Sequence, residues 1–342
     1  MSVASAARGA RPALHGMGPL VSVPGKLFLA GEYAVLEGGA AVLTAVGRTA
    51  TAVFVPGLVP ATPLVAAACA HAKAALQTRG FDLPAGAARV DTSTFMRAGT
   101  KLGLGSSAAA AVAAVAAAFA HSGLDVESEH ALLRATADAA HRAAQGGVGS
   151  GADIAASVHG GFLRFVRAPE SGPPNVTIAH LEPPPDLHMV TFWTRSAART
   201  TDFIGGVERL RRDRPAVHAR CLADLRAAAG DFASAFATSA TATVMAAAHC
   251  YAAMVALGEE AALPIVMPVV AEAAALAARL GGAAKPSGAG GGDMGIGFFG
   301  DKGAADQFVA QCPAGVLVLE IPLGASGARL GSSSSVSNFK KD

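Results

Sequence analysis

Gly103-Leu104-Gly105-Ser106-Ser107-Ala108 is a glycine-rich turn that opens into an alanine-rich stretch ending near Gly123. Its glycines permit close approach of the backbone to a ligand, and the positive end of a helix dipole favours negative charge there. Ser106 and Ser107 supply hydroxyls and candidate helix caps, and a hydroxyl at this place could reach a nucleotide-bound Mg²⁺. The stretch therefore predicts a phosphate cradle at the start of a helix, with an ordinary capped helix after a tight turn as the alternative.

The same turn also fits a different nucleotide motif. Gly103, Gly105 and Ala108 match the dinucleotide-binding fingerprint, and Asp125 lies at about the expected distance beyond them. However, Phe95 to Lys101 carry two basic residues and a glycine where that motif requires a buried strand, and the chain lacks the P-loop pattern G-x-x-x-x-G-K-[ST]. The dinucleotide reading is weak for this reason.

Two more glycine-rich segments follow along the chain. Gly146-Gly-Val-Gly-Ser-Gly-Ala-Asp153 ends in a carboxylate that either orients or deprotonates a nucleophile or simply caps the next helix. Lys285-Pro-Ser-Gly-Ala-Gly-Gly-Gly-Asp293 precedes an apolar strand. Because so many glycines are costly in chain entropy, close approach to a ligand is the natural explanation of that segment, and a flexible hinge is the alternative.

A fourth piece lies near the N-terminus, where Pro24-Gly-Lys-Leu-Phe-Leu-Ala-Gly-Glu-Tyr33 places Lys26 on an expected strand and Glu32-Tyr33 after a turn. A lone lysine is usually a solvated charge. Lys26 is a candidate functional residue only because the glycine-rich segments accompany it.

Composition bounds the class of protein. The 342 residues, 52% of them apolar, suggest two domains, and the net charge of +2 is mixed along the chain, which argues against nucleic-acid binding. The most apolar run, Ala108 to Ala120, is shorter than the roughly 20 residues of a membrane span. Four dispersed cysteines suggest neither a zinc site nor a disulfide framework and fit a reducing cytoplasm.

Strands and helices intermix without a regular βαβ repeat, which predicts an α+β protein of two lobes with a boundary near residues 170 to 190.

Taken in this order and spacing, the segments resemble the three signature motifs of the GHMP kinase superfamily, over about Val21 to Ile321. Within it, Gly25 to Glu37, Ala144 to Ala156 and Ser287 to Ile296 are most similar to the phosphomevalonate kinase family. Trp193-Thr-Arg-Ser-Ala-Ala-Arg-Thr-Thr201 is similar, though imperfectly, to the W-T-x-x-x-A-[ST]-[ST] stretch which that family has near its substrate.

The resemblance implies ATP- and Mg²⁺-dependent phosphorylation of (R)-5-phosphomevalonate to the 5-diphosphate, on the mevalonate route to isoprenoids. It also implies an N-terminal lobe like domain 2 of ribosomal protein S5 and a ferredoxin-like C-terminal lobe. We expect a small-molecule substrate, no nucleic-acid or membrane partner, and a monomer or homodimer. The expected parts are a disordered extension (1–20), an N-terminal ATP-binding lobe (21–180), a C-terminal lobe (181–325) and a flexible tail (326–342).

The resemblance also implies roles for individual residues. Asp153 would contact the attacking phosphate oxygen, Lys26 would neutralise charge there, and Ser107 would help to hold Mg²⁺. The residues expected to bind ATP are Lys101, Gly103, Leu104, Gly105, Ser106, Ser107 and Ala108. Those expected to bind substrate are Glu32, Tyr33, Ser150, Arg195, Ser196, Ser287, Gly288, Ala289 and Gly290. Arg199 and Lys285 are further cationic candidates, each with a surface-charge alternative.

Departures from the family leave alternatives open. Mevalonate kinase has a Mg²⁺-binding glutamate on the helix before the catalytic aspartate, whereas the matching stretch here, His141 to Gln145, has no acid, and Asp138 is the nearest. Arg195 and Arg199 stand where small residues are common. Another GHMP kinase such as mevalonate kinase, a non-catalytic metabolite sensor on the same fold, and a related decarboxylase remain the alternatives.

Overall fold

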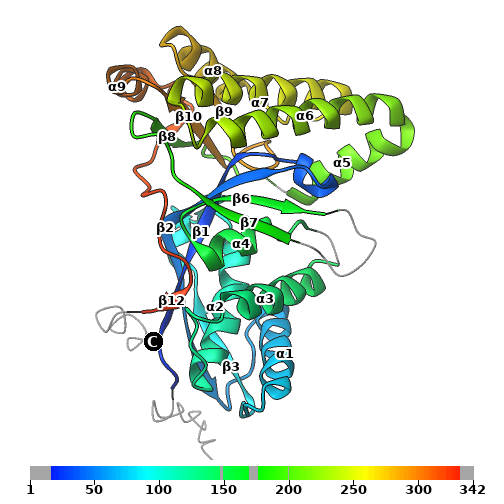
Figure 1. Cartoon of the computed structure of the whole chain (residues 1–342), viewed down its shortest axis with the longest axis vertical. Helices are drawn as coiled ribbons and strands as arrows, with labels where there is room; N and C mark the ends of the chain where they lie inside the picture. The colour runs from blue at the N-terminus through cyan, green and yellow to red at the C-terminus, as the bar shows by residue number, and fades with distance from the viewer. Residues whose placement is uncertain (1–16, 147–148, 169–175, 199, 332–342) are drawn as a thin grey trace, which may run out of the picture.

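The computed structural model describes residues 17–146, 149–168, 176–198 and 200–331. These residues form two large antiparallel sheets and one small two-stranded sheet, and the helices are divided between the two large sheets as two lobes stacked along the long axis of the molecule (Figure 1). The chain passes from the first sheet to the second between residues 181 and 188. The mixture of helices with antiparallel sheets confirms the predicted α+β class.

The first sheet takes strands from both ends of the described chain. Its strands run in the order β12-β1-β2-β6-β7, with β3 paired to β2. Their bounds are Arg329–Leu330 (β12), Val21–Ala30 (β1), Ala41–Pro56 (β2), Phe162–Arg167 (β6), Val176–Leu181 (β7) and Gly86–Asp91 (β3). β1 is buried along nearly its whole length, so polar residues on it lie inside the protein.

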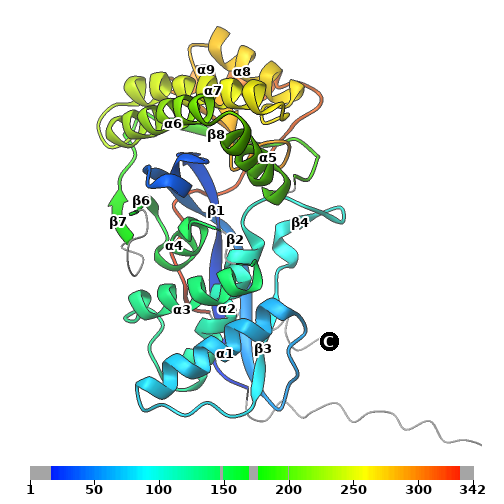
Figure 2. The ribbon, with the colours of Figure 1, turned by 90° about the vertical axis from the view of Figure 1, so that its right-hand side faces the viewer.

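Four helices cover one side of this sheet (Figure 2). They are α1 (Pro63–Thr78), α2 (Ser106–His121), α3 (His130–Ala144) and α4 (Ala152–His159). α2 and α4 pack against β1 and β2, while α1 and α3 pack over α2. The alanines of α2 allow it to lie close to the sheet, and its residues from Ala108 to Phe119 are buried. Both helices whose first turns follow a glycine-rich segment therefore start beside β1.

The second sheet has the strand order β11-β8-β10-β9. Its strands are Leu317–Val318 (β11), His188–Trp193 (β8), Met294–Phe299 (β10) and Ala283–Pro286 (β9). The helices of this lobe are α5 (Thr200–Asp213), α6 (Pro215–Ala235), α7 (Ala240–Ala261), α8 (Pro268–Arg279) and α9 (Lys302–Gln311). α6 also contacts β1 and β2, so the second lobe rests on the first sheet.

Helix α7 alone, among the residues described, is long and apolar enough to cross a membrane by length and composition, a feature the sequence analysis did not identify. Core helices of globular proteins meet the same test. α7 packs against α6, β9 and β10, and its buried residues repeat along one face from Ala240 to Gly258. These contacts are those of a core helix of the second lobe.

The C-terminal segment corrects the predicted tail. Leu323 and Ser326 form bridges to Val46 and Gly160, and β12 pairs with β1. Residues 326 to 331 are therefore part of the first lobe, because they satisfy backbone groups at the edge of its sheet. Residues 332–342 of that tail, and residues 1–16 of the predicted extension, lie outside the described residues.

Short elements complete the first lobe. Two 3₁₀ turns, η1 (Ala34–Glu37) and η2 (Ser93–Phe95), follow β1 and β3. A small hairpin of β4 (Met96–Arg97) and β5 (Thr100–Lys101) projects from the body of the molecule, as Figure 2 shows. It carries the exposed side chain of Lys101 and leads directly into the glycine-rich turn before α2.

Candidate active site

The turn before α2 has the backbone that its glycines predict. Gly103 and Gly105 both adopt left-handed conformations, with φ of 78° and 77°. Gly105 is the N-cap of α2, and no side chain caps the helix there, so Ser106 and Ser107 are not the caps that the sequence suggested. The amide groups at the start of α2 thus remain available to an anion. The side chains of Leu104 and Ala108 are buried in the core, so these two residues can offer a ligand only their backbone.

Lys26 lies directly beside this turn. Its side chain leaves no room for a Cβ on Gly105, which would lie 2.9 Å from Lys26 Cγ, and its backbone NH donates to Leu104 O at 2.9 Å. The ammonium lies 5.0 Å from the centre of the Phe28 ring and 3.7 Å from Asp153 Oδ2. The lysine is buried, with 8% of its surface exposed, and so is not the solvated charge that is usual for a lone lysine.

Asp153 lies in the first turn of α4, whose N-cap is Gly151 without a side-chain cap. The carboxylate therefore does not cap the helix, so the alternative prediction that Asp153 is only a helix cap is wrong. Its side chain is 35% exposed, which leaves one side open beside the Lys26 ammonium. The helix dipole stabilises a negative charge at this place. Lys26 and Asp153, which are 127 positions apart in the sequence, form a charged pair between two helix N-termini.

The loop before Asp153 is held by charged side chains of its own lobe. Arg167 Nη1 donates to Ser150 O at 3.1 Å and lies 3.8 Å from Asp138 Oδ2. Ser150 is nearly buried, and its hydroxyl accepts from Ala152 N at 3.2 Å. Asp138 is thus engaged in holding the loop. Residues 147–148 of the predicted segment lie outside the described residues.

His141 is a site residue that the sequence analysis did not identify. Its Nε2 lies 3.1 Å from Ser107 Oγ and 3.0 Å from Gln145 Nε2. Burial lowers the pKa of His141, and the nearby carboxylates of Asp153 and Asp138 oppose that shift. When the neutral imidazole carries its proton on Nδ1, the single lone pair of Nε2 can accept a hydrogen bond from the Ser107 hydroxyl or from the Gln145 amide. The sequence pointed to this stretch only through the resemblance, which leads one to expect an acid between His141 and Gln145.

The third segment joins the two lobes. Lys285 is completely buried, and its ammonium lies 2.5 Å from Glu32 Oε1. The Tyr33 hydroxyl donates to Ala289 O at 2.5 Å, and Phe28 N donates to Ser287 Oγ at 2.9 Å. Burial and the Glu32 charge raise the pKa of Tyr33, so the phenol remains a donor. Lys285 is therefore neither a surface charge nor free to reach a ligand.

The glycines of this segment differ in what they meet. A Cβ on Gly290 would lie 2.1 Å from Ile265 O, and one on Gly291 would lie 1.9 Å from the Phe203 ring. Gly288, in contrast, has nothing within 4 Å of its Cβ position. Packing against the protein, and not only approach to a ligand, explains the glycine content. Only Gly288 among these three faces open space.

The remaining predicted residues lie on the loop after β8. Arg195 is exposed and left-handed, with φ of 60°, and Ser196 O accepts from Asp293 N at 2.7 Å. Arg199 lies outside the described residues. Across residues 17–146, 149–168, 176–198 and 200–331, no group of three or more His, Cys, Asp or Glu side chains could hold a metal ion.

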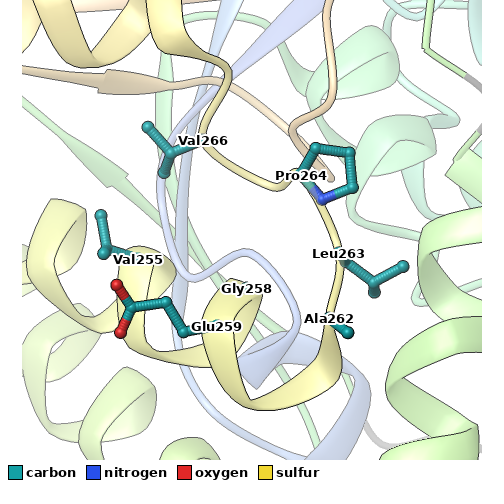
Figure 3. A pocket seen from close by; sticks show the side chains of 7 residues that line it. All are labelled: Val255, Gly258, Glu259, Ala262, Leu263, Pro264 and Val266. Atoms are coloured by element: carbon teal, nitrogen blue, oxygen red, sulfur yellow. The ribbon is translucent and has the colours of Figure 1, made fainter.

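Two surface depressions are apparent, and neither contains Lys26 or Asp153. One of about 360 Å³ lies at the end of α7, between that helix and residues 262 to 266 (Figure 3). The other, of about 250 Å³, lies beside Ser150 and Arg167. We place the site by its chemistry instead, since the charged pair and two helix N-termini converge at the lobe junction and a polar ligand there needs no deep apolar cavity.

Comparison with known proteins identifies the class. The model described as GHMP kinases N terminal domain matches residues 63–161, and that described as GHMP kinases C terminal matches residues 232–316. The chain belongs to the GHMP kinases, a family of phosphotransferases, and has their two-lobed fold, as the resemblance predicted.

Several individual proteins are similar to this chain over most of its length. The chain is 30% identical to a phosphomevalonate kinase of Streptomyces sp. (strain CL190), over 83% of this chain and 90% of the relative. A crystal structure of the Lin0012 protein from Listeria innocua aligns with a TM-score of 0.82 at 26% identity, covering 91% of this chain and all of that one. Streptococcus pneumoniae phosphomevalonate kinase, in complex with phosphomevalonate and AMPPNP, aligns with a TM-score of 0.75 at 20% identity, covering 89% and 99%. At that identity the likeness shows the fold alone.

Proposed function

We propose that the chain transfers the γ-phosphoryl group of ATP to the phosphate of (R)-5-phosphomevalonate, which yields (R)-5-diphosphomevalonate and ADP. The observation that carries the proposal is the Lys26–Asp153 pair at 3.7 Å, between the uncapped N-termini of α2 and α4. The 30% identity to a phosphomevalonate kinase supports the choice of acceptor.

The donor phosphates would bind at the turn Gly103 to Ser107, where backbone amides and the α2 dipole favour an anion. Lys101, exposed on β5 just before the turn, would add a cation at its edge. A phosphoryl-transfer site needs this kind of positioning and charge compensation more than covalent chemistry. AMPPNP in the structurally similar S. pneumoniae enzyme supports ATP as the donor.

The acceptor would lie between Asp153 and the third segment. A phosphate monoester has a second pKa of about 6, so it is largely a dianion at neutral pH. One of its oxygens forms a bond to the γ-phosphorus while the bond from that phosphorus to the bridging oxygen of ADP breaks, and no proton has to be removed from the nucleophile. Asp153 then serves to orient the acceptor, and Lys26 offsets the repulsion between two anions.

Magnesium fits the site only with help from the ligand. The chain offers the Ser107 hydroxyl and the Asp153 carboxylate, so nucleotide phosphates and water would supply most of the six oxygens that Mg²⁺ requires. When bound, the ion would neutralise charge on the transferred group. His141 would hold the Ser107 hydroxyl in a fixed orientation, since its ring nitrogen lies 3.1 Å from that oxygen.

Purified protein with Mg²⁺-ATP and 5-phosphomevalonate should form ADP in a coupled assay. Asp153→Asn should remove at least 99% of this activity and leave the thermal melting temperature nearly unchanged. Asp82→Asn, the same change at an exposed position of the first lobe, is the matched control and should retain activity. Lys26→Met should lower kcat because the repulsion between the two anions is no longer offset.

A substrate panel separates the alternatives. Turnover of mevalonate, homoserine or a sugar without turnover of 5-phosphomevalonate would refute the acceptor but not the family. Release of carbon dioxide would indicate a decarboxylase. ATP binding without turnover over the whole panel would indicate a sensor.

A further inference from the structure

Asp293, the last residue of the third glycine-rich segment, lies between the two loops that the proposed reaction must align. It has a left-handed backbone, with φ of 57°. Its NH donates to Ser196 O at 2.7 Å, and its carbonyl oxygen accepts from both Thr194 N and Thr194 Oγ1 at 3.0 Å. Thr194 and Ser196, which flank Arg195, are thus both hydrogen-bonded to Asp293 of the third glycine-rich segment.

The side chain of Asp293 extends this hold to the far end of the same loop. Its Oδ1 accepts a hydrogen bond from Ala198 N at 3.3 Å. The loop Thr194–Ala198, which we call the acceptor loop, is therefore fixed at its start by the Asp293 backbone and at its end by the Asp293 carboxylate. A fixed loop explains how Arg195 holds a left-handed conformation, which is unfavourable for an arginine in isolation.

The other side of Asp293 contacts the first lobe. A Cβ on Gly103 would lie 2.3 Å from Asp293 Cβ and 2.8 Å from Oδ2, so the carboxylate packs directly on the glycine turn before α2. Burial raises the pKa of Asp293, while the Ala198 amide and the charges of Lys26 and Lys101 oppose that shift. Asp293 thus touches the proposed donor turn and holds the acceptor loop.

The acceptor loop presents a cation. In the part of the chain that the structure describes, the exposed Arg195 guanidinium forms no hydrogen bond or ion pair. Guanidinium groups bind phosphate through paired hydrogen bonds, and the strength of such binding depends on the orientation of the planar group. An acceptor without a phosphate group has no dianionic group that Arg195 could bind.

We propose that Asp293 is a positioning residue that holds the acceptor loop so that Arg195 binds the phosphate of the acceptor, and that it thereby sets a preference for a phosphorylated over an unphosphorylated acceptor. The inference rests on the proposed function. The role assigned to Asp293 is positioning and not chemistry, because its carboxylate accepts from Ala198 N and packs on Gly103.

Two substitutions separate the effect of the Asp293 carboxylate from the effect of its left-handed backbone. Asp293→Gly removes the carboxylate and tolerates a left-handed backbone, whereas Asp293→Asn tolerates that backbone and keeps an oxygen that accepts from Ala198 N. Ala262→Gly is the matched control, because Ala262 is also left-handed, with φ of 51°, and lies at the end of α7. It should change neither the kinetics nor exchange in the acceptor loop.

Hydrogen–deuterium exchange of residues 194–198 tests the hold on the loop without any acceptor. Asp293→Gly should speed exchange there by at least tenfold, and Asp293→Asn should leave it close to the wild type. In steady-state assays Asp293→Gly should lower kcat/KM for 5-phosphomevalonate by about tenfold to a hundredfold, and change KM for ATP less than threefold. The ratio of kcat/KM for 5-phosphomevalonate to that for mevalonate should fall by a similar factor.

The double variant Asp293→Gly/Arg195→Ala should be no worse than Arg195→Ala alone, because both changes remove the same contact. Additive losses, unchanged exchange, or an unchanged acceptor ratio would each overturn the inference while wild-type turnover stands. Absence of wild-type turnover on 5-phosphomevalonate would instead refute the proposed function, and the acceptor preference with it.

Discussion

Replacing Lys285 with methionine tests the junction between the lobes. Lys285 on β9 and Glu32 after β1 are both nearly inaccessible, with exposed fractions of 0% and 4%. The lysine ammonium lies 2.5 Å from Glu32 Oε1 and 2.7 Å from Pro286 O. In Lys285→Met the Gly288 amide, at 3.4 Å, would be the one donor left to the buried Glu32 carboxylate within the described part of the chain.

The expected loss in the free energy of unfolding follows from the burial of Lys285 and Glu32. Removing one partner of a buried ion pair leaves an uncompensated charge and destabilises a protein by about 3–5 kcal/mol, whereas removing both charges is often nearly neutral. Lys285→Met should therefore lower the free energy of unfolding by about 3–5 kcal/mol. The double variant Glu32→Gln/Lys285→Met should recover more than half of that loss, because the amide of glutamine needs no counter-charge.

Urea unfolding measures both effects. Circular dichroism reports on the whole chain, and the fluorescence of Trp193, the single tryptophan, reports on β8 of the second lobe. Lys302→Met is the control, since Lys302 forms an exposed i,i+4 pair with Asp306 and should contribute less than about 0.5 kcal/mol. A Lys285→Met loss below about 1 kcal/mol, or a double variant as unstable as the single one, would refute the reasoning.

Three further predictions concern single residues. Gly103→Ala should weaken ATP binding at least tenfold in a calorimetric titration, because a Cβ there lies 2.3 Å from Asp293 Cβ, whereas Gly80→Ala, with a φ of 77° and open space, should leave ATP affinity unchanged. Tyr33→Phe removes the hydroxyl that donates to the third segment and should cost about 1 kcal/mol in chemical denaturation, and an unchanged midpoint would contradict this. Burial, aided by the charges of its neighbours, lowers the pKa of His159 to about 4; these neighbours are His130, Arg134 and His180. Since the unfolded chain takes up the proton near pH 6.5 and the folded chain does not, stability should fall by about 1–2 kcal/mol between pH 6.5 and 4.5, and thermal melts of His159→Leu should not show this component.

The sequence was a good guide to the parts of the site that depend on local backbone. The glycine turn at Gly103 and Gly105 and the helix after it could be predicted because left-handed glycines and helix N-termini are local features. Lys26 and Asp153 could be brought together only through the resemblance to a family. No spacing rule joins two residues that are 127 positions apart.

What the sequence did not reveal depends on burial and on contacts between the lobes. Lys285 was expected at the surface or near a ligand, but its partner Glu32 is 253 positions away and both are buried at the junction. The glycine-rich segment was expected to approach a ligand closely, and the sequence did not reveal that Gly290 and Gly291 also make room for Ile265 and Phe203. The tail from residue 326 had a composition typical of disorder, yet the edge of the first sheet supplies hydrogen-bond partners that composition cannot show.

The contacts across the lobe junction are unequal, and this inequality indicates where the site can open. Residues 28–33 hold residues 285–289 through a buried ion pair and hydrogen bonds from Phe28 N and the Tyr33 hydroxyl. Among the described residues, Gly103 and Asp293 meet across the same junction in van der Waals contact without a hydrogen bond, and the charges of Lys26 and Lys101 act on the Asp293 carboxylate. Separating atoms in van der Waals contact costs far less than exposing a buried charge without its partner. Of these two contacts, the one between Gly103 and Asp293, beside the proposed phosphate cradle, should therefore separate at the lower cost.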